Sequence, residues 1–187
     1  MDNSTFTIGI MWMVYYLIHS LLAASSIKSA LGNHKLYRLT YSALSCILLI
    51  PIVLSIDQNQ SYLFHPHFAL STLGIILTLG GLVIVLLSFQ YFSSLEFIGL
   101  KPSAKSLLIE KGLHRYVRHP IYSGTILVFA GLWFSNPTTQ LLVTMLVTFI
   151  YLPIGIFFEE KKLVTEFGKD YLEYKSRVPA IFPNLFF

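Results

Sequence analysis

The stretch Phe68–Phe89, with the sequence FALSTLGIILTLGGLVIVLLSF, decides the fold because it contains no charged side chain. About 20 apolar residues in a helix are enough to cross roughly 30 Å of hydrocarbon at about 1.5 Å per residue. A helix at the surface of a soluble protein would instead carry its apolar side chains as a stripe on one face. We therefore predict that Phe68–Phe89 spans a membrane.

The composition of the whole chain also indicates a membrane protein. Of its 187 residues, 55% are hydrophobic and only 12% are charged, and the mean hydropathy is +0.67. Soluble domains carry about 25% charged residues. Four further apolar runs predict spans at Phe6–Ala24, Leu36–Ile56, Ile121–Ser135 and Thr138–Phe158. The predicted fold class is all-α, a polytopic membrane protein with about five transmembrane helices.

The flanks of these runs carry further information. No basic residue precedes Phe6–Ala24, and this run contains Trp12, so we expect it to stay in the mature protein and not to act as a cleaved signal peptide. Asn136 and Pro137 leave only a tight turn between the last two runs. We expect those two runs to form an antiparallel helical hairpin.

The basic residues predict the orientation of the chain. All 13 Lys and Arg residues fall in three segments, namely Lys28, Lys35 and Arg38, then Lys101, Lys105, Lys111, Arg115 and Arg118, then Lys161, Lys162, Lys169, Lys175 and Arg177. With five spans, these segments lie on one side, which the positive-inside rule makes cytosolic. We predict an N-terminus outside and a C-terminus in the cytosol, in the inner membrane if the protein is bacterial. The net charge of +4 then needs no nucleic-acid partner.

Beyond the fifth run the sequence becomes charged and amphipathic. Leu163, Phe167, Tyr171 and Tyr174 recur at spacings of three and four residues, which places them on one face of a helix. We expect a C-terminal amphipathic helix on the cytosolic side, ended by Pro179, that either lies against the membrane or closes over the domain.

Two polar clusters lie at the cytosolic ends of predicted spans. The first is Arg118–Tyr122, with the sequence RHPIY, where the fourth span begins. Pro120 suits the first turn of a helix, and the free backbone amides of such a turn can bind an anionic group. Arg and Tyr also anchor span ends in the membrane interface. The cluster is therefore either a ligand site or an anchor.

The second polar cluster is the pair Glu159 and Glu160, directly after the fifth run. A carboxylate at the end of a span is costly in lipid, so it must face water, a cation or a ligand. The pair is either solvated beside Lys161 and Lys162 or part of a site. Because both clusters lie at the ends of adjacent helices, we expect that they can enclose one site.

Further polar residues lie within or near the spans. His114 either points into the same site or is solvated in its loop. His19 is a polar group inside the first span and needs an interhelical hydrogen bond. Cys46 has no second cysteine to pair with, so it is expected to be a packing residue. His65 and His67 have a spacing seen in metal sites but lack a third ligand nearby, so we expect no metal.

Two motifs in the C-terminal half resemble a known family. The stretch GLHRYVRHPIYSG at residues 112–124 resembles the RHPxYxG signature of the isoprenylcysteine carboxyl methyltransferase superfamily. The segment from Glu159 to Pro183 resembles the EExxL...FGxxYxxYxxxVPxxxP tail of the same superfamily. The N-terminal half is similar to the branch containing methanethiol S-methyltransferases and NnrU-type proteins, at His19–Ala23 with Lys28, at Tyr37–Leu39 and Tyr41, and at Phe97–Leu100.

This resemblance implies a single membrane methyltransferase domain over residues 1–187. Residues 1–92 would hold three spans and residues 93–187 would form the half that binds the cofactor, S-adenosylmethionine. The cofactor-binding residues that it implies are Leu108, Ile109, His114, His119, Pro120, Ile121, Tyr122, Glu159 and Glu160. We expect Glu159 and Arg118 to act at the catalytic centre, with Arg118 pairing with the cofactor carboxylate because its guanidinium can bind it through two hydrogen bonds.

One departure from the family concerns the methyl acceptor. Prenylcysteine methyltransferases carry an Arg one helical turn before the first Glu of the pair, and here that position is Gly155. The missing cation favours a neutral or thiol acceptor, or a lipid head group bound by other means. We expect a small or lipophilic acceptor, a thiol or a prenylcysteine-like molecule, that enters from the bilayer between the third, fourth and fifth spans.

Two alternatives belong to other classes. One is a phospholipid N-methyltransferase, for which membrane lipids are the substrate. The other is a non-enzymatic transporter or assembly factor of the same fold. The absence of charge within the spans argues against transport, because transport pathways usually contain ionisable residues.

Overall fold

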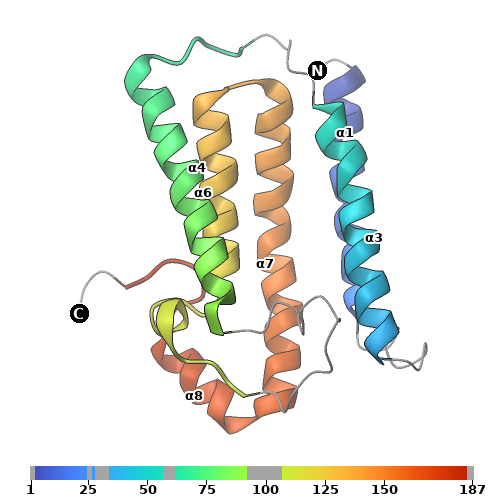
Figure 1. Ribbon diagram of the computed structural model, residues 1–187, viewed down its shortest axis with the longest axis vertical. Coiled ribbons are helices and arrows are strands. Elements are labelled where there is room, and N and C mark those ends of the chain that lie inside the picture. The colour runs from blue at the N-terminus through green and yellow to red at the C-terminus, as the bar shows by residue number, and fades with distance from the viewer. Residues whose placement is uncertain (1–2, 25–26, 28–33, 57–61, 92–106, 185–187) are drawn as a thin grey trace.

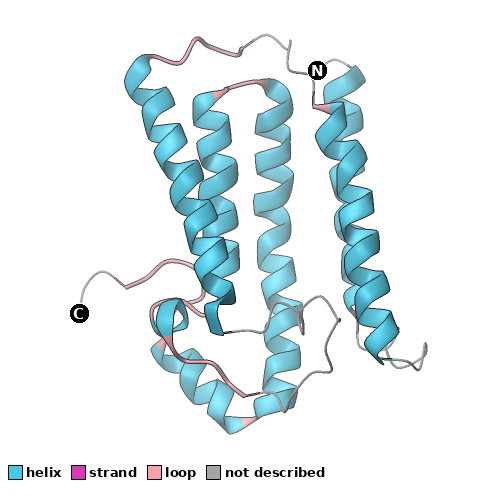
Figure 2. Ribbon diagram, viewed as in Figure 1, coloured by secondary structure: helices cyan, strands magenta, loops and turns pink. Residues whose placement is uncertain are grey.

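The computed structural model describes residues 3–24, 27, 34–56, 62–91 and 107–184. Helices make up most of this part of the chain (Figure 2). In chain order they are α1 (Asn3–Ala23), α3 (His34–Ser55), α4 (Phe68–Ser88), the short 3-10 helices η1 (Phe89–Tyr91) and η2 (Gly112–Arg115), then α6 (Pro120–Ser135), α7 (Thr139–Phe167) and α8 (Lys169–Arg177). The predicted all-α fold class is confirmed for these residues.

Each of the five predicted apolar runs is helical. Three of the helices, α1, α4 and α7, are long and apolar enough to cross a membrane, whereas the apolar parts of α3 and α6, Leu39–Ser55 and Pro120–Ser135, are shorter. Large apolar side chains point outward along them, such as Phe68 at 87% and Leu54 at 79% exposed. Because such a surface requires lipid around it, the protein is an integral membrane protein. The count of five complete spans stays a prediction.

The helices form two groups that meet at α7 (Figure 1). On one side α4 lies along α6, and α6 lies beside α7. On the other side α1 packs against α7, and α3 packs against α1. The buried side chains of Ile8, Trp12 and Ile52 join α1 to α3, and Phe129 and Val147 pack against them from α6 and α7. The core therefore lies along α1 and links both groups.

Glycines allow the backbones of α4 and α6 to touch. A Cβ atom at Gly81 would lie 2.6 Å from the carbonyl oxygen of Gly124, and one at Gly131 would lie 2.5 Å from that of Gly74. No side chain fits at these distances, so glycine is required at the crossing. Close approach through small residues is how helices associate in lipid, where the hydrophobic effect does not drive packing.

The turn between α6 and α7 confirms the predicted antiparallel hairpin. Asn136 ends α6 by donating its backbone N–H to the carbonyl of Leu132. Thr138 then caps α7, because its hydroxyl accepts from the backbone N–H of Leu141 at 3.3 Å. Only three residues lie between the helices, so α6 and α7 must run antiparallel to each other.

The C-terminal region differs from the prediction of one separate amphipathic helix. No helix-breaking residue lies between Phe158 and Phe167, so α7 continues past its apolar part to Phe167. The break comes at Gly168, whose φ of 58° is accessible to glycine at little cost, and α8 begins directly after it. The predicted apolar face is nevertheless formed, since Leu163 and Phe167 from α7 pack with Tyr171 and Tyr174 from α8.

Candidate functional site

Glu160 is the centre of a buried ion cluster at the α8 end of the molecule. Its Oε1 accepts from the guanidinium of Arg118 at 3.0 Å from Nε and 2.5 Å from an Nη, and its Oε2 accepts from Lys175 Nζ at 2.5 Å. His119 Nε2 lies 3.3 Å from Oε1. The Glu160 side chain is only 10% exposed, so the carboxylate has exchanged water for these partners.

This environment holds Glu160 in its charged form. The residue lies beyond Phe158, where the apolar part of α7 ends. Burial alone would raise its pKa, but the hydrogen bonds from Lys175, Arg118 and His119 lower the pKa to about 2. Because its partners already surround both oxygens, Glu160 is a structural centre of the site and has little free capacity for a ligand.

Arg118 also holds the segment that follows α8. One of its Nη atoms donates to the carbonyl of Lys175 at 3.1 Å and to that of Val178. Its backbone N–H donates to the carbonyl of Pro179 at 2.8 Å, and the next N–H donates to that of Ala180 at 2.9 Å. Residues 178–180 therefore lie against the start of α6, so the amphipathic tail closes over the domain.

The guanidinium of Arg118 makes four hydrogen bonds within the protein. This leaves little capacity for the predicted pairing with a cofactor carboxylate, which stays a prediction. What the structure assigns to Arg118 is the joining of α6, α7 and α8. Ser123 adds to this connection, since its hydroxyl donates to the carbonyl of Ile181 at 2.6 Å.

Glu159 is the accessible carboxylate of the pair. Its side chain is 45% exposed, and Oε2 lies 3.7 Å from His119 Nδ1. The hydroxyl of Tyr122, one turn into α6, also interacts with it. His119 is 4% exposed and sits between the two carboxylates, with Pro120 starting α6 directly after it. The RHPIY and EE clusters are thus brought together, as their positions on adjacent helices predicted.

His114 reaches the same region from η2. It is 8% exposed, and its backbone carbonyl accepts from the hydroxyl of Tyr174 at 2.6 Å. Burial, and to a smaller extent the nearby His119, lowers the pKa of His114, so its imidazole is neutral at physiological pH. Leu108 packs against Tyr174 and its neighbours, and Ile109 follows as a half-buried residue. The predicted residues before α6 therefore line the end of the bundle where the glutamates lie.

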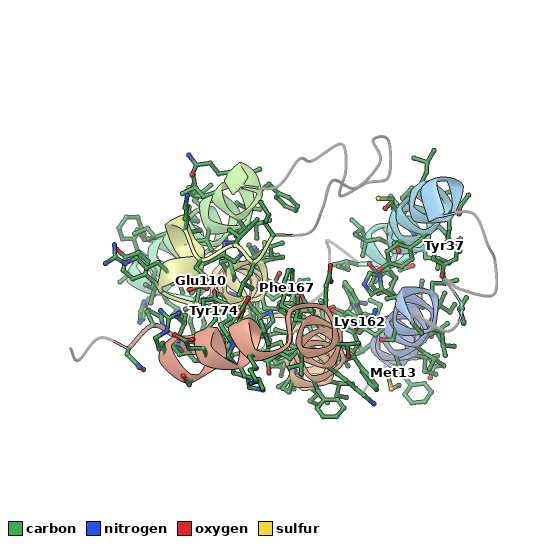
Figure 3. The ribbon with its side chains drawn as sticks, turned by 90° about the horizontal axis from the view of Figure 1, so that it is seen from below. Met13, Tyr37, Glu110, Lys162, Phe167 and Tyr174 are labelled. Atoms are coloured by element: carbon green, nitrogen blue, oxygen red, sulfur yellow. The ribbon has the colours of Figure 1, made fainter. Side chains whose placement is uncertain are left out.

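Two functional contacts were not visible in the sequence. Lys175 was noted only as one of many basic residues, yet it donates to Glu160 across a helix break. Lys162 donates its Nζ to the carbonyl of Ala23 at the end of α1, and Figure 3 shows it on the side of α7 that faces α1. A cation at a helix C-terminus is favourable, but no spacing rule links residues this far apart in the chain.

Other predicted residues have different outcomes. His67 caps α4, because its Nδ1 accepts from the backbone N–H of Leu70 at 3.0 Å, which gives it a structural role. His19 forms the predicted interhelical hydrogen bonds, to Tyr41 and Ser45 of α3. The motif residues Lys28 and Phe97–Leu100 lie outside the described residues.

The fold and the site define a polytopic helical membrane protein with a polar centre at one end of its bundle. The chain belongs to the phospholipid methyltransferase family, whose model matches residues 69–170. This match includes α6, all of α7 and all the residues of the RHPIY and EE clusters. The match confirms that the motifs resemble those of the family because the chain is a member of it.

Curated relatives are named as methyltransferases. The chain is 31% identical over 187 aligned residues to the methanethiol S-methyltransferase of Pseudomonas deceptionensis, covering 89% of this chain and 68% of the relative. It is 42% identical over 72 residues to methanethiol S-methyltransferase 1 of Bradyrhizobium diazoefficiens, covering 38% and 24%. It is 33% identical over 96 residues to the protein-S-isoprenylcysteine O-methyltransferase of Schizosaccharomyces pombe, covering 50% and 39%. Several matches thus cover only a quarter to a third of the relative's length.

Proposed function

We propose that the protein is an integral membrane methyltransferase that uses S-adenosylmethionine and acts on a small or lipophilic acceptor, a thiol or a prenylcysteine-like molecule. The observation that carries this proposal is the difference in environment between the two adjacent glutamates. Glu160 is enclosed by cations, whereas Glu159 beside it is open to a ligand at the start of α6. The relatives' names, which describe methyl transfer to sulfur or to a prenylcysteine, support it.

The described residues fit this cofactor. S-Adenosylmethionine supplies an activated methyl group on a positively charged sulfur, and it also carries an ammonium group and ribose hydroxyls. Glu159 can accept hydrogen bonds from such donors, and the backbone amides of α6 after His119 suit a carboxylate. In this proposal Leu108, Ile109 and the neutral His114 contribute to the wall of the site. Glu160 and Arg118 then hold the segment Pro120–Tyr122 in place.

In this proposal the protein contributes position and exclusion of water. Methyl transfer to a thiolate needs little acid or base help once the two reactants are aligned and partly desolvated. The tail lies over residues 118–119 and covers the buried side chains of Arg118 and His119 from solvent. The catalytic role of Glu159 is to hold the cofactor's polar groups while the acceptor approaches from the membrane.

The orientation is part of the proposal. The described basic residues from Lys111 to Arg118 and from Lys161 to Arg177 lie at the end of the bundle where α8 lies (Figure 1). By the positive-inside rule this end faces the cytosol, where S-adenosylmethionine is made. The N-terminus then lies outside, and a bacterial protein would occupy the inner membrane as a single domain over residues 1–187.

The test is titration calorimetry with S-adenosylmethionine and the detergent-purified protein. Micromolar binding is expected for the wild type and its loss is expected for Glu159→Gln, which removes the accepting charge. Glu166→Gln, an exposed glutamate on the same helix, is the matched control and should bind like the wild type. Equal affinity in Glu159→Gln would remove Glu159 from the site, and no binding to the wild type would favour a non-enzymatic role.

The family model's description makes phospholipid N-methylation the second candidate. Mass spectrometry of lipids from expressing cells separates the two candidates. N-Methylated head groups that appear only with the active protein would support the lipid activity. Methylated thiols without any change in the lipids would support the first proposal.

A further inference from the structure

A second polar cluster lies within the membrane, where α1, α3 and α7 meet. His19 Nε2 lies 2.9 Å from the hydroxyl of Tyr41, and its Nδ1 lies 3.3 Å from that of Ser45. The hydroxyl of Ser20 lies 2.9 Å from that of Tyr151 on α7. We call these five residues the His19 cluster. None of the residues assigned to the cofactor belongs to it.

The cluster is more exposed than the Trp12–Thr144 hydrogen bond of the same helix. Trp12, about two helical turns before His19 on α1, donates to Thr144 at 3.0 Å, and both of these residues are buried. All five residues of the His19 cluster are only half-buried, although they lie within apolar helices. Polar groups at membrane depth that are not enclosed by protein usually face a pathway or a ligand. The burial pattern therefore indicates a place that something occupies.

The cluster is connected to the cofactor end of the bundle. Tyr151 lies two helical turns before Glu159 on α7, and Gly155 lies between them. A Cβ atom at Gly155 would be 3.2 Å from the hydroxyl of Tyr122, so the lack of a side chain lets Tyr122 lie across α7. Tyr122 interacts with Glu159 at one end and is close enough to Tyr151 and Tyr41 to interact with them electrostatically. Tyr122 and Tyr151 both lie beside Gly155, so these two aromatic residues stand between the two polar sites.

The bilayer side of the cluster is apolar. A groove between α1 and α3 is lined by Tyr15 and Ile18 on one helix and by Leu48 and Ile52 on the other. The ring of Tyr15, which lines this groove, stacks on that of His19 at 5.8 Å between centroids, so the groove and the cluster share a neighbouring side chain. By contrast, α4 and α6 touch through their backbones at Gly81 and Gly124, which leaves no gap at that crossing. The expected entry between the third, fourth and fifth spans stays a prediction.

The chemistry of the cluster selects the kind of acceptor. α1, α3 from Leu39 onward and α7 up to Phe158 contain no charged residue, so neither a carboxylate nor an ammonium group finds a partner there. The thiol of cysteine has a pKa of about 8.5 and the imidazole of histidine one of about 6.5. Thiols are much stronger acids than alcohols, so proton transfer to an imidazole is far easier from a thiol than from an alcohol. Aromatic rings also contact sulfur favourably. A thiol attached to an apolar group matches all of these features.

We propose that the His19 cluster binds the thiol of the methyl acceptor, with the apolar part of the acceptor in the groove between α1 and α3, and that His19 removes the thiol proton. This proposal rests on the proposed methyltransferase function. The S–H bond breaks, its electron pair stays on sulfur, and the proton bonds to a ring nitrogen of His19. The hydroxyls of Tyr41 and Ser45 can donate or accept, so one can turn away and leave a ring nitrogen free for the thiol proton while the other accepts a hydrogen bond from the imidazolium. The thiolate formed is the species that accepts the methyl group.

The test uses 1-butanethiol as the probe and S-adenosylhomocysteine to fill the cofactor site of the purified protein. The readout is the ultraviolet difference absorption of the bound thiolate, measured beside the affinity for S-adenosylhomocysteine by calorimetry. The wild type should show the thiolate band. His19→Gln keeps a polar side chain but cannot take up a proton, so it should lose the band and slow methylation of butanethiol about 100-fold or more. Its affinity for S-adenosylhomocysteine should stay within about twofold, since His19 lies outside the cofactor site.

Trp12→Phe is the matched control, because it removes another interhelical hydrogen bond of α1 outside the cluster. It should keep both the band and the cofactor affinity. Tyr41→Phe, which keeps the ring and removes the hydroxyl on His19, should weaken the band and provides a second variant if His19→Gln does not fold. A thiolate band in His19→Gln equal to that of Trp12→Phe would overturn the proposal. Cofactor binding without any thiolate band in the wild type would overturn it while leaving the methyltransferase function intact, whereas absence of cofactor binding would overturn both.

Discussion

At the scale of single residues, the carboxylate of Glu160 shows why two adjacent glutamates can have different tasks. Glu160 is surrounded by Arg118, Lys175 and His119, while Glu159 keeps almost half of its side chain exposed. The two side chains point in different directions from α7, because consecutive residues on a helix are rotated by about 100°. The first organises three segments of the chain and the second remains available for a ligand.

We expect Glu160→Gln to destabilise the protein strongly. The neutral amide leaves the buried guanidinium of Arg118 without its counter-charge, and breaking such a buried pair costs about 3 kcal/mol or more. The melting temperature in detergent measures the loss. Glu166→Gln, at an exposed position on the same helix, should change it little. Equal melting temperatures for the two variants would show that the ion cluster does not stabilise the fold.

The pH dependence of this difference follows from the lowered pKa of Glu160. A carboxyl whose pKa falls from 4.5 to about 2 on folding contributes stability above pH 4.5 and loses it as the pH falls toward 2. The melting temperatures of the wild type and of Glu160→Gln should therefore converge over that window. Thermal scans at stepped pH give the measurement, and a constant gap down to pH 2 would mean that Glu160 is not charged through its contacts.

At the scale of helices, the pair α4 and α6 depends on the absence of side chains. In Gly81→Ala the new Cβ would lie 2.6 Å from the Gly124 carbonyl oxygen and 2.8 Å from the Val128 backbone nitrogen. The helices must move apart, and overpacking of this kind costs about 1–3 kcal/mol. The adjacent Gly80 has nothing within 4 Å of its Cβ position, so Gly80→Ala should be neutral or stabilising. Melting temperatures that shift in the same direction would contradict this packing.

The elements differ in how well the sequence predicted them. Long apolar runs and the Asn136–Pro137 turn are local signals, so all five apolar helices and the hairpin were found in place. The break at Gly168 was missed because the apolar spacing continues across it, from Leu163 to Tyr174, as if the helix were unbroken. A glycine inside an amphipathic pattern is compatible with one unbroken helix and with two helices that meet at the glycine. Only the packing of α8 on η2 decides between them.

The candidate site was predicted only in part for a similar reason. Motif residues such as His119 and Glu159 could be assigned to one place because they mark the ends of adjacent helices. The partners of Arg118 could not be predicted, since they include the backbone carbonyls of Lys175 and Val178. Every residue has such a carbonyl, so the sequence does not show which ones accept a hydrogen bond. The half-buried state of the His19 cluster is likewise a property of three helices together and of no single segment.

At the scale of the whole molecule, the placement of charge predicts a testable topology. With Cys46 replaced by Ser, a cysteine introduced by His65→Cys should react with a membrane-impermeant maleimide in intact cells, because its loop lies at the end of the bundle opposite α8. A cysteine introduced by Lys161→Cys should react only after the membrane is opened. Both positions are exposed, so access alone decides the result. The reverse pattern would invert the orientation and place the cofactor site outside.

The hydrogen bonds from Arg118, His119 and Ser123 to residues 179–181 also set an order of events during synthesis. A ribosome delivers α6 and α7 to the membrane before it has made the segment that closes over them. Until then the Glu160 carboxylate has Arg118 and His119 but not Lys175, and the start of α6 lacks the cover of the tail. The nascent protein therefore inserts its helices first and completes the ion cluster around Glu160 only when α8 and the segment after it have been made.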